Sequence, residues 1–561
     1  MDRFSTGLIS QGVDVGTGSV RAALVTDSGE IKKVKVEETK TWNDQPDFYE
    51  QSFDNIWGAA INCVKDVIQG INPEEIKGIG FDATCSLVCF DKEGKPLTIS
   101  PGGSNERNII LWLDHRAVKE ADEINKTNHE VLRYVGGKIS PEMETPKLLW
   151  LKRNMKKTWD EAGYFFDLPD ALTWRATNVD CRSKCSLVCK WTYEMTEEGD
   201  EGWNLSYFQE IGMEDLSANC WRKIGNCIQA PCEPVGYGLC ERAAGELGLK
   251  KGTPVGTSMI DAHAGGLGLI GTKADGIDPA FHTRLSLICG TSTCHMAVSP
   301  TAIFVPGVWG PYKDAMIPGM WLSEGGQSAT GKLIDFIIET HPATPEIMKK
   351  KGNEPIMIYL NKILEDMAKK NNLPSVSLLT HDVHVWPDFH GNRSPIADPL
   401  LKGMVSGLTL AGDEESLALL YLATIQSLAY GTRHIIDALR KAGYKELKSL
   451  LLCGGLSKNP IFTQTHAEVC NLPLVCPEEP ESVLLGAAIL GACASGTFGS
   501  MKETIAAMGS NGIVVNPTSD RNIVDFHTKK YQVFHMMYKH QMEYRNTMRG
   551  SQCDPRCAGS S

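Results

Sequence analysis

Apolar runs separated by short polar turns open the chain. One run extends from Gly7 to Val15, and after a glycine-rich turn another extends from Ser19 to Val25, which predicts a hairpin. A helical period follows at Ile56 to Ile68, and two further apolar runs, Ile76 to Asp82 and Leu87 to Phe90, predict strands. Strands mixed with helices at this spacing predict an α/β layered domain.

The same plan returns in the second half of the chain. Ser286 to Val298 again predicts two strands around a glycine turn, whose tip is Gly290-Thr291-Ser292-Thr293. Two related halves would then divide near Thr272 to Phe281, where Asp275 to Pro279 is rich in Gly, Asp and Pro. A single mixed domain with two unrelated turns fits the pattern equally well. The polar, lysine-rich stretch Pro342 to Pro374 surrounds one amphipathic helix and is interpreted as a surface insertion.

Length, charge and hydropathy narrow the class of protein. A chain of 561 residues suggests two large domains or three smaller ones. The net charge of -12 argues against a broad nucleic-acid surface. The longest apolar run, Val483 to Ala494, is shorter than the roughly 18 residues of a membrane span and predicts a buried helix. The N-terminus carries no secretory pattern, so we expect a cytoplasmic protein.

The 18 cysteines include one closely spaced group, Cys181, Cys185 and Cys189, which would share one face of a helix. A metal site normally needs a fourth ligand or tighter pairs, so packing is favoured over metal binding. Cys553 and Cys557 lie in a Gly/Ser/Arg tail that is expected to be disordered.

The two glycine turns are the first candidates for chemistry. A tight turn rich in glycine and hydroxyls aims several backbone N–H groups at one point, which suits phosphate oxygens. In the first turn Asp14 precedes Gly16-Thr17-Gly18-Ser19, and its carboxylate could hold a hydrated Mg²⁺ beside those phosphates. Either turn alone is more often an ordinary hairpin, but one in each half indicates a nucleotide held between lobes.

Two other phosphate motifs are rejected. Gly326 to Lys332 fits most of a P-loop, but Leu333 stands where a Ser or Thr should ligate Mg²⁺. Gly266, Gly268 and Gly271 match a dinucleotide fingerprint by spacing, yet no convincing strand precedes them. Close helix packing explains these three glycines better.

Asp261 is the candidate catalytic base. It stands in Ile260-Asp261-Ala262-His263-Ala264 at a predicted strand-to-helix junction, among small residues that leave it open to a ligand. Phosphoryl transfer to an alcohol needs a carboxylate within hydrogen-bond reach of the attacking hydroxyl. The alternative is a helix N-cap. His263 is interpreted as a packed or supporting residue.

Other polar residues lie in apolar surroundings. Trp112-Leu113-Asp114-His115-Arg116 offers an aromatic platform with polar partners, and Lys190 beside Trp191 could bind a sugar oxygen. Glu324 and Gln327 frame a glycine pair. Each could equally be a structural ion pair or a solvated group. His381, His384 and His390 are explained by a loop rather than by a metal.

Taken together, these residues resemble the FGGY carbohydrate kinases, in order from about Gly12 to about Tyr544. The matching segments are Asp14–Arg21, Leu111–Ala117, Pro146–Leu151, Ile260–Gly265, Gly290–Ser292, Glu324–Gly331 and Cys453–Pro460. Two further segments, Gly80 to Ser86 and Trp386 to Arg393, resemble the ribulokinase branch of this family more than its glycerol or xylulose kinases.

The resemblance implies two ribonuclease-H-like, actin-like ATPase domains of α/β class with an active-site cleft between them. Residues 1–272 would bind the sugar, 273–550 the nucleotide with an insertion at about 342–374, and 551–561 would be a tail. ATP and Mg²⁺ are implied, with a small sugar, D-ribulose first, as the acceptor; a homodimer would be compatible.

The residue roles that the resemblance implies fall into four sets. Asp261 would be the base and Asp14 would serve Mg²⁺. Thr84, Cys85, Trp112, Asp114, His115, Lys190 and Glu324 would face the sugar. Gly16, Thr17, Gly18, Ser19, Arg21, Gly290, Thr291, Ser292, Gln327, Gly331, Gly454, Gly455 and Asn459 would face ATP.

One departure and two alternatives remain. The family's first signature expects a small or hydroxyl residue where Glu144 stands. A kinase for L-ribulose, D-xylulose, ribitol or glycerol would share all of the phosphate machinery. A non-catalytic actin-like protein that binds nucleotide as a sensor or scaffold would share the glycine turns, but it would not need Asp261 or the sugar-facing residues.

Overall fold

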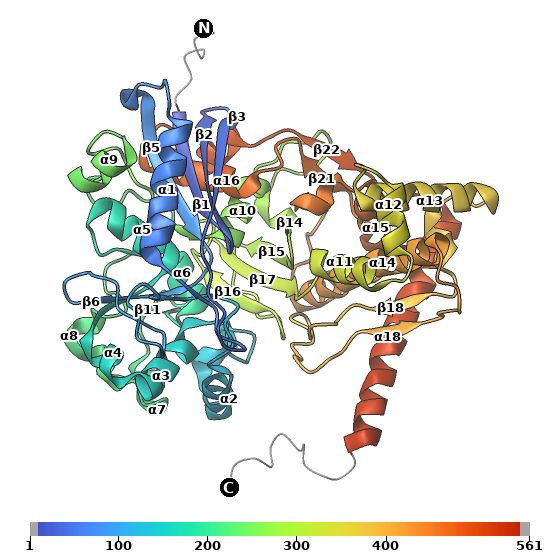
Figure 1. The fold of residues 1–561 in the computed structure, drawn as a ribbon, viewed down its shortest axis with the longest axis horizontal. Coiled ribbons are helices and arrows are strands. Elements are labelled where there is room, and N and C mark those ends of the chain that lie inside the picture. Colours follow the sequence, from blue (N-terminus) through green and yellow to red (C-terminus); the bar gives the residue numbers. More distant parts are fainter. Residues whose placement is uncertain (1–8, 550–561) are drawn as a thin grey trace.

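Two mixed sheets, in separate lobes, organise the computed structural model, which describes residues 9–549 (Figure 1). The first has the order β13-β5-β1-β2-β3, with bounds Met259–Ile260, Ile76–Ala83, Ile9–Val15, Ser19–Thr26 and Ile31–Glu38. The second has the order β16-β17-β15-β14-β20-β21-β22, with bounds Trp309–Lys313, Trp321–Gln327, Thr293–Ser299, Arg284–Cys289, Ser449–Cys453, Leu474–Pro477 and Gly512–Val515.

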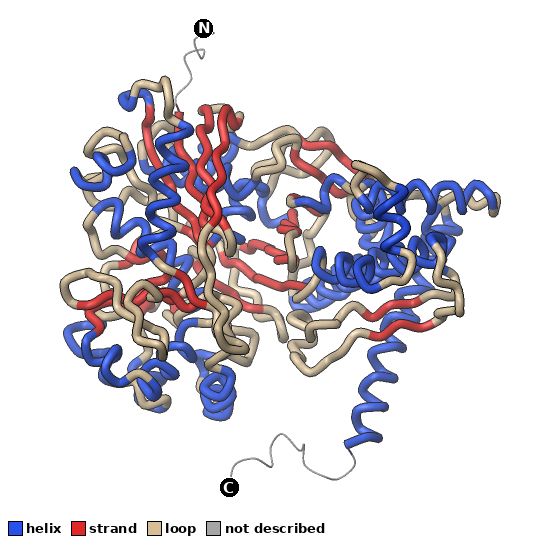
Figure 2. Tube along the Cα trace, in the orientation of Figure 1, coloured by secondary structure: helices blue, strands red, loops and turns tan. Residues whose placement is uncertain are grey.

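Both sheets are built on the same unit. β1 pairs with β2 as an antiparallel hairpin and with β5 in parallel, while β14 pairs with β15 as a hairpin and with β20 in parallel. The two predicted hairpins are therefore confirmed, and in Figure 2 their strands stand side by side among the helices.

The remaining elements surround these sheets. A small sheet of order β4-β7-β6-β8 spans Glu50–Gln51, Ile109–Ile110, Leu87–Asp91 and Ala162–Asp167. Short pairs join β9 (Arg182–Ser183) to β12 (Ile228–Gln229), β10 (Glu194–Met195) to β11 (Glu201–Gly202), and β18 (His384–Trp386) to β19 (Met404–Ser406). The earlier helices are α1 Phe53–Val67, α2 Val118–Thr127, α3 Glu144–Asn154, α4 Lys156–Glu161, α5 Leu168–Thr177, α6 Lys184–Lys190, α7 Leu205–Glu210, α8 Ala218–Trp221, α9 Glu241–Leu247 and α10 Asp261–Ile270. The later ones are α11 Gly331–Thr340, α12 Thr344–Lys350, α13 Ile356–Lys370, α14 Glu414–Ala442, α15 Pro460–Cys470, α16 Ser482–Ala494, α17 Met501–Met508 and α18 Arg521–Arg549.

Helices α10 and α16 join the lobes. α16, from the second half of the chain, packs on β1 and β5 of the first sheet, and α10, from the first half, packs on β14 of the second sheet and on α16. Glycines make these contacts possible, because a methyl group added at Gly12, Gly80 or Gly268 would overlap the backbone of α16. The buried helix predicted at Val483 to Ala494 and the packing role of Gly268 are confirmed.

We expect Gly268→Ala to destabilise the protein by at least about 1–3 kcal/mol, because the added methyl overlaps the carbonyl oxygen of Ser482. Gly245→Ala in α9 is the matched control, since nothing lies within 4 Å of its added methyl. Alanine is the better helix former there, so this control should gain about 0.5–1 kcal/mol. Urea unfolding of both variants measures the difference, and equal midpoints would contradict the packing argument.

Two expectations need correction, and a third falls on residues that the structure does not describe. The stretch Pro342 to Pro374 holds two helices, α12 and α13, and α13 buries Leu360 and Leu364 against the core with α14, so it is part of the lobe and not a surface insertion. Cys181 precedes α6 and is not on the helix that carries Cys185 and Cys189. Cys553 and Cys557 lie outside the described residues.

Within residues 9–549, no helix combines the length and the apolar character that crossing a membrane requires. The cysteines in this range are free thiols.

Candidate active site

Three carboxylates meet where the parallel strands of the first sheet end. Asp14 on β1 is in register with Asp82 on β5, and Met259 on β13 is also a partner of Asp82, two residues before Asp261. Side chains at facing positions of neighbouring strands point to the same side of a sheet, so Asp14 and Asp82 lie together with Asp261 beside them. Parallel strands therefore bring residues that are far apart in sequence to one place.

Asp82 is a site residue that the sequence reasoning missed as an individual. It is fully buried, and neither of its carboxyl oxygens has a hydrogen-bond partner. Burial, and then the neighbouring Asp14, raise the pKa of Asp82 well above its ordinary value. The signal available in the sequence was an acidic residue at the end of the apolar run that begins at Ile76. A strand end with a purely structural role does not require a buried carboxyl group without a hydrogen-bond partner.

Arg21 links this carboxylate cluster to the second half of the chain. Its Nε donates to Oδ2 of Asp14 at 2.7 Å, and its guanidinium forms an ion pair with Glu481 at 2.6 Å, just before α16. The first glycine turn and the start of α16 are thus tied together through one side chain.

Asp261 begins α10, and Ile260 occupies the N-cap position, so the N-cap alternative is not what the structure shows. Its Oδ1 accepts a hydrogen bond from the N–H of Ala262 at 2.7 Å, and its side chain is partly exposed. Burial first, and Asp14 second, raise the pKa of Asp261 to about 7. A carboxylate with a pKa near the working pH is suited to accept a proton from an alcohol.

The predicted nucleotide-facing backbone gathers at one edge of the second sheet. The N–H of Gly331 donates to the carbonyl of Gly290 at 3.2 Å, and the N–H of Thr330 donates to Thr291 at 2.9 Å. Gly454 has a positive φ of 94°, and a side chain there would overlap the carbonyl of Cys289. Gly290, Thr291 and Gly455 are exposed, so these backbone groups are open to a ligand.

Three predicted ligand side chains are instead occupied by the protein. Asn459 caps α15, and its amide also bonds Asn361 and Tyr421. Gln327 donates to the carbonyl of Leu428 at 2.7 Å. Asp114 accepts bonds from Arg116 and from the N–H of Tyr49. Because their polar groups are already satisfied, we assign these side chains to holding the walls of the site.

Two of the residues predicted to face a sugar meet between the lobes. Lys190, at the end of α6, lies 3.7 Å from Glu324 on β17, and both are buried. Desolvation is the largest single influence and would lower the pKa of Lys190, but Glu324 and other neighbours together outweigh it, so the pKa of Lys190 is raised. Desolvation would likewise raise the pKa of Glu324, but Lys190 and other neighbouring cations together lower it, so both groups are charged. Oε2 of Glu324 has no hydrogen-bond partner and is therefore available to a hydroxyl donor.

Other residues complete this region. Trp309, which no pattern in the sequence singled out, has the Lys190 ammonium over its ring at 4.4 Å and the Arg393 guanidinium at 5.1 Å. Arg393 reaches across to Glu142 at 3.2 Å. Burial raises the pKa of the Cys85 thiol well above its ordinary value, although the nearby Lys190 lowers it in part.

Three further predicted residues line the neighbouring loops. Nε1 of Trp112 donates to Oγ1 of Thr17 at 3.1 Å, which joins the aromatic platform to the first glycine turn. Thr84 is buried beside Ser86, with their hydroxyls 3.1 Å apart, and His115 is half-buried. Glu144, the departure from the family signature, is fully buried 3.4 Å from Lys147.

Matches to known proteins cover nearly the whole chain. The model for the N-terminal domain of the FGGY family of carbohydrate kinases matches residues 9–268, and the model for its C-terminal domain matches residues 285–495. A human FGGY carbohydrate kinase domain-containing protein is 53% identical over 95% of this chain and 96% of its own length. A D-ribulokinase of Saccharomyces cerevisiae is 38% identical over 88% of this chain and 72% of its own length.

The fold is also found among solved structures. The xylulose kinase from Rhodospirillum rubrum superposes with a TM-score of 0.76 at 17% identity, covering 96% of this chain and 99% of that one. The predicted two-domain α/β fold of the actin-like type is confirmed by this similarity.

Proposed function

Because this chain belongs to the FGGY family of carbohydrate kinases, we propose that it transfers the γ-phosphoryl group of ATP to a ketopentose, D-ribulose before other sugars. The observation that carries the proposal is the position of Asp261, which lies close enough to Asp14 and to Lys190 for both charges to influence its pKa, while Asp14 is in register with Asp82 and Lys190 is paired with Glu324. The similarity to the yeast D-ribulokinase supports the choice of sugar.

In the proposed reaction, residues 1–272 hold the sugar and residues 273–550 hold ATP. Lys190 donates to a sugar oxygen, and the free Oε2 of Glu324 accepts from a sugar hydroxyl. The attacking hydroxyl gives its proton to Asp261 while its oxygen bonds to the γ-phosphorus and the bond to ADP breaks. Backbone N–H groups around Gly290 and Gly16 orient the phosphates, and closure of the lobes excludes water that would otherwise hydrolyse ATP.

Asp14 and Asp82 would hold the Mg²⁺ that ATP-dependent kinases require. Their oxygens are the ligand type that Mg²⁺ prefers, and Asp82 is a buried carboxyl that lacks any other partner. When bound, the ion neutralises charge on the transferred phosphoryl group.

We expect Asp82→Asn to weaken Mn²⁺ binding in the presence of a non-hydrolysable ATP analogue by about tenfold or more, a loss in the range known for groups supporting a metal. Electron paramagnetic resonance of Mn²⁺ measures this without turnover. Asp27→Asn, an equal charge change on a turn outside the cluster, is the control. If the Asp82→Asn variant binds Mn²⁺ as tightly as wild type, the Asp82 carboxyl has only a structural role and does not hold the metal.

Substrate identity is tested by initial rates with D-ribulose, L-ribulose, D-xylulose, ribitol and glycerol, with ATP and Mg²⁺. The proposal expects the highest kcat/KM for D-ribulose. A higher kcat/KM for another compound in this panel would change the assigned substrate but not the assignment of the protein as a kinase. Absence of sugar-stimulated ADP release across the panel would favour a nucleotide-binding scaffold.

A further inference from the structure

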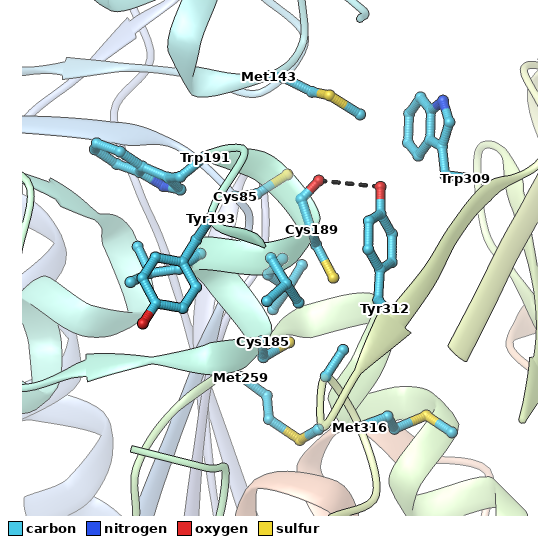
Figure 3. Close-up of a cluster of buried hydrophobic side chains, with 14 of the residues drawn as sticks. Cys85, Met143, Cys185, Cys189, Trp191, Tyr193, Met259, Trp309, Tyr312 and Met316 are labelled. Atoms are coloured by element: carbon cyan, nitrogen blue, oxygen red, sulfur yellow. Dashed lines mark hydrogen bonds between the residues drawn. The ribbon is translucent and has the colours of Figure 1, made fainter. Parts of the chain in front are cut away.

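Two cysteines and a histidine form a compact cluster beneath the proposed sugar site. Cys185 and Cys189 are one turn apart on α6, and His263 faces them from α10, with their ligand atoms all within 4.8 Å of one another. All three side chains are buried. Figure 3 shows both thiols on α6, near Met259, Tyr312 and Met316, with the hydroxyl of Tyr312 bonded to the carbonyl of Cys189.

The distances in this cluster approach those of a tetrahedral metal site. Sγ of Cys189 lies 3.4 Å from Nε2 of His263, and Oε2 of Glu324 lies 3.6 Å from the same nitrogen. Ligand atoms about 2.0–2.3 Å from a zinc ion must be roughly 3.3–3.9 Å apart. Glu324 approaches Nε2 of His263 at this spacing, but it is not among the residues whose ligand atoms all lie within 4.8 Å of one another, so its side chain would have to turn toward the thiols to act as the fourth ligand.

The ligand types and their charges also fit. An imidazole nitrogen and two cysteine sulfurs are ligand types that zinc binds in proteins. Two thiolates and the Glu324 carboxylate carry three negative charges, and a divalent cation with the adjacent Lys190 carries three positive charges. A buried cluster without net charge avoids most of the desolvation cost that an isolated ion would meet.

We propose that Cys185, Cys189 and His263, with Glu324 as fourth ligand, form a site for a thiophilic divalent cation such as Zn²⁺ that excludes the sugar. Binding releases the two thiol protons to solvent, with no change of oxidation state. Because Glu324 belongs to the opposite lobe, the cation holds the lobes closed and occupies the carboxylate that the sugar would use.

The test uses full-length protein freed of metal by a chelator and titrated with Co²⁺ in the absence of ATP. Wild type is expected to bind one equivalent with a thiolate-to-cobalt absorption band. Cys185→Ser and Cys189→Ser should each weaken binding at least tenfold. Cys181→Ser is the matched control, since Cys181 is also buried nearby but bonds Gln229 instead, and it should bind as wild type does.

X-ray absorption of zinc-loaded wild type provides a measurement that needs no variant, and it should show two sulfur neighbours at about 2.3 Å and lighter neighbours at about 2.0–2.2 Å. Lack of a thiolate band in wild type, or an undiminished band in both serine variants, would overturn the proposal. A further arm adds D-ribulose, which should raise the apparent Kd for Co²⁺. That arm depends on the proposed function, whereas the cobalt and zinc measurements do not.

Discussion

Asp261→Asn is expected to lower kcat by about 10²–10⁴-fold, with the KM for the sugar changed only a few-fold. The amide keeps the size of the carboxylate and its bond to the N–H of Ala262, but it cannot accept the proton of the attacking hydroxyl. In the proposed function the sugar is bound instead by Lys190 and Glu324, whose ion pair the substitution leaves in place. Steady-state kinetics separates the two effects.

The pH dependence provides a control for this result. A carboxylate base works only when it is deprotonated, so the wild-type rate should fall on the acidic side, while the residual rate of Asp261→Asn should lack that dependence. Asp66→Asn, a substitution in the last turn of α1 at a residue that pairs with Lys33, should retain wild-type rates. Near-normal turnover of Asp261→Asn would remove Asp261 from the role of base.

Glu324→Gln is expected to reduce both sugar binding and stability. It leaves Lys190 buried without its counter-charge, and breaking a buried pair in this way costs about 3–5 kcal/mol. It also weakens the acceptor offered to a sugar hydroxyl, so we expect kcat/KM to fall by about 10²-fold, in line with the cost of losing a bond to a charged group. Urea unfolding and initial rates measure the two consequences.

A double substitution tests whether the pair acts as a unit. Glu324→Gln combined with Lys190→Met should lose less stability than the two single changes added together, because no unpaired charge remains. Glu74→Gln is a matched control, since Glu74 forms an exposed pair with Lys250 at 2.8 Å whose loss should change little. Strict additivity of the two buried substitutions would contradict the coupling.

Local patterns in the sequence were sufficient for much of the fold. Runs of apolar residues and glycine turns predict the hairpins at Ile9–Thr26 and Arg284–Ser299 and the buried helix α16. The insertion was misjudged because the polar side of α13 dominates its composition, whereas Leu360 and Leu364 meet α14 only in the folded chain.

The site was harder to predict because its members depend on pairing between distant segments. Asp14 and Asp261 stand in recognisable surroundings, but only the parallel register of β1 and β5 reveals that Asp82 lies beside Asp14. Trp309 and Arg393 come together with Lys190 only across the lobes. Asn459 and Gln327 were interpreted as ligand contacts, since a sequence does not show which amides the protein itself satisfies.

The reciprocal packing of α10 and α16 has a consequence for how this protein is assembled. A fragment ending at residue 272 would keep β1 and β5 but lose α16, leaving the glycine-lined surface around Gly12 and Gly80 bare. The complementary fragment would lack α10 beside β14. Neither piece contains its own complete core, so limited proteolysis between the lobes should yield two fragments that remain associated, and each expressed by itself should aggregate.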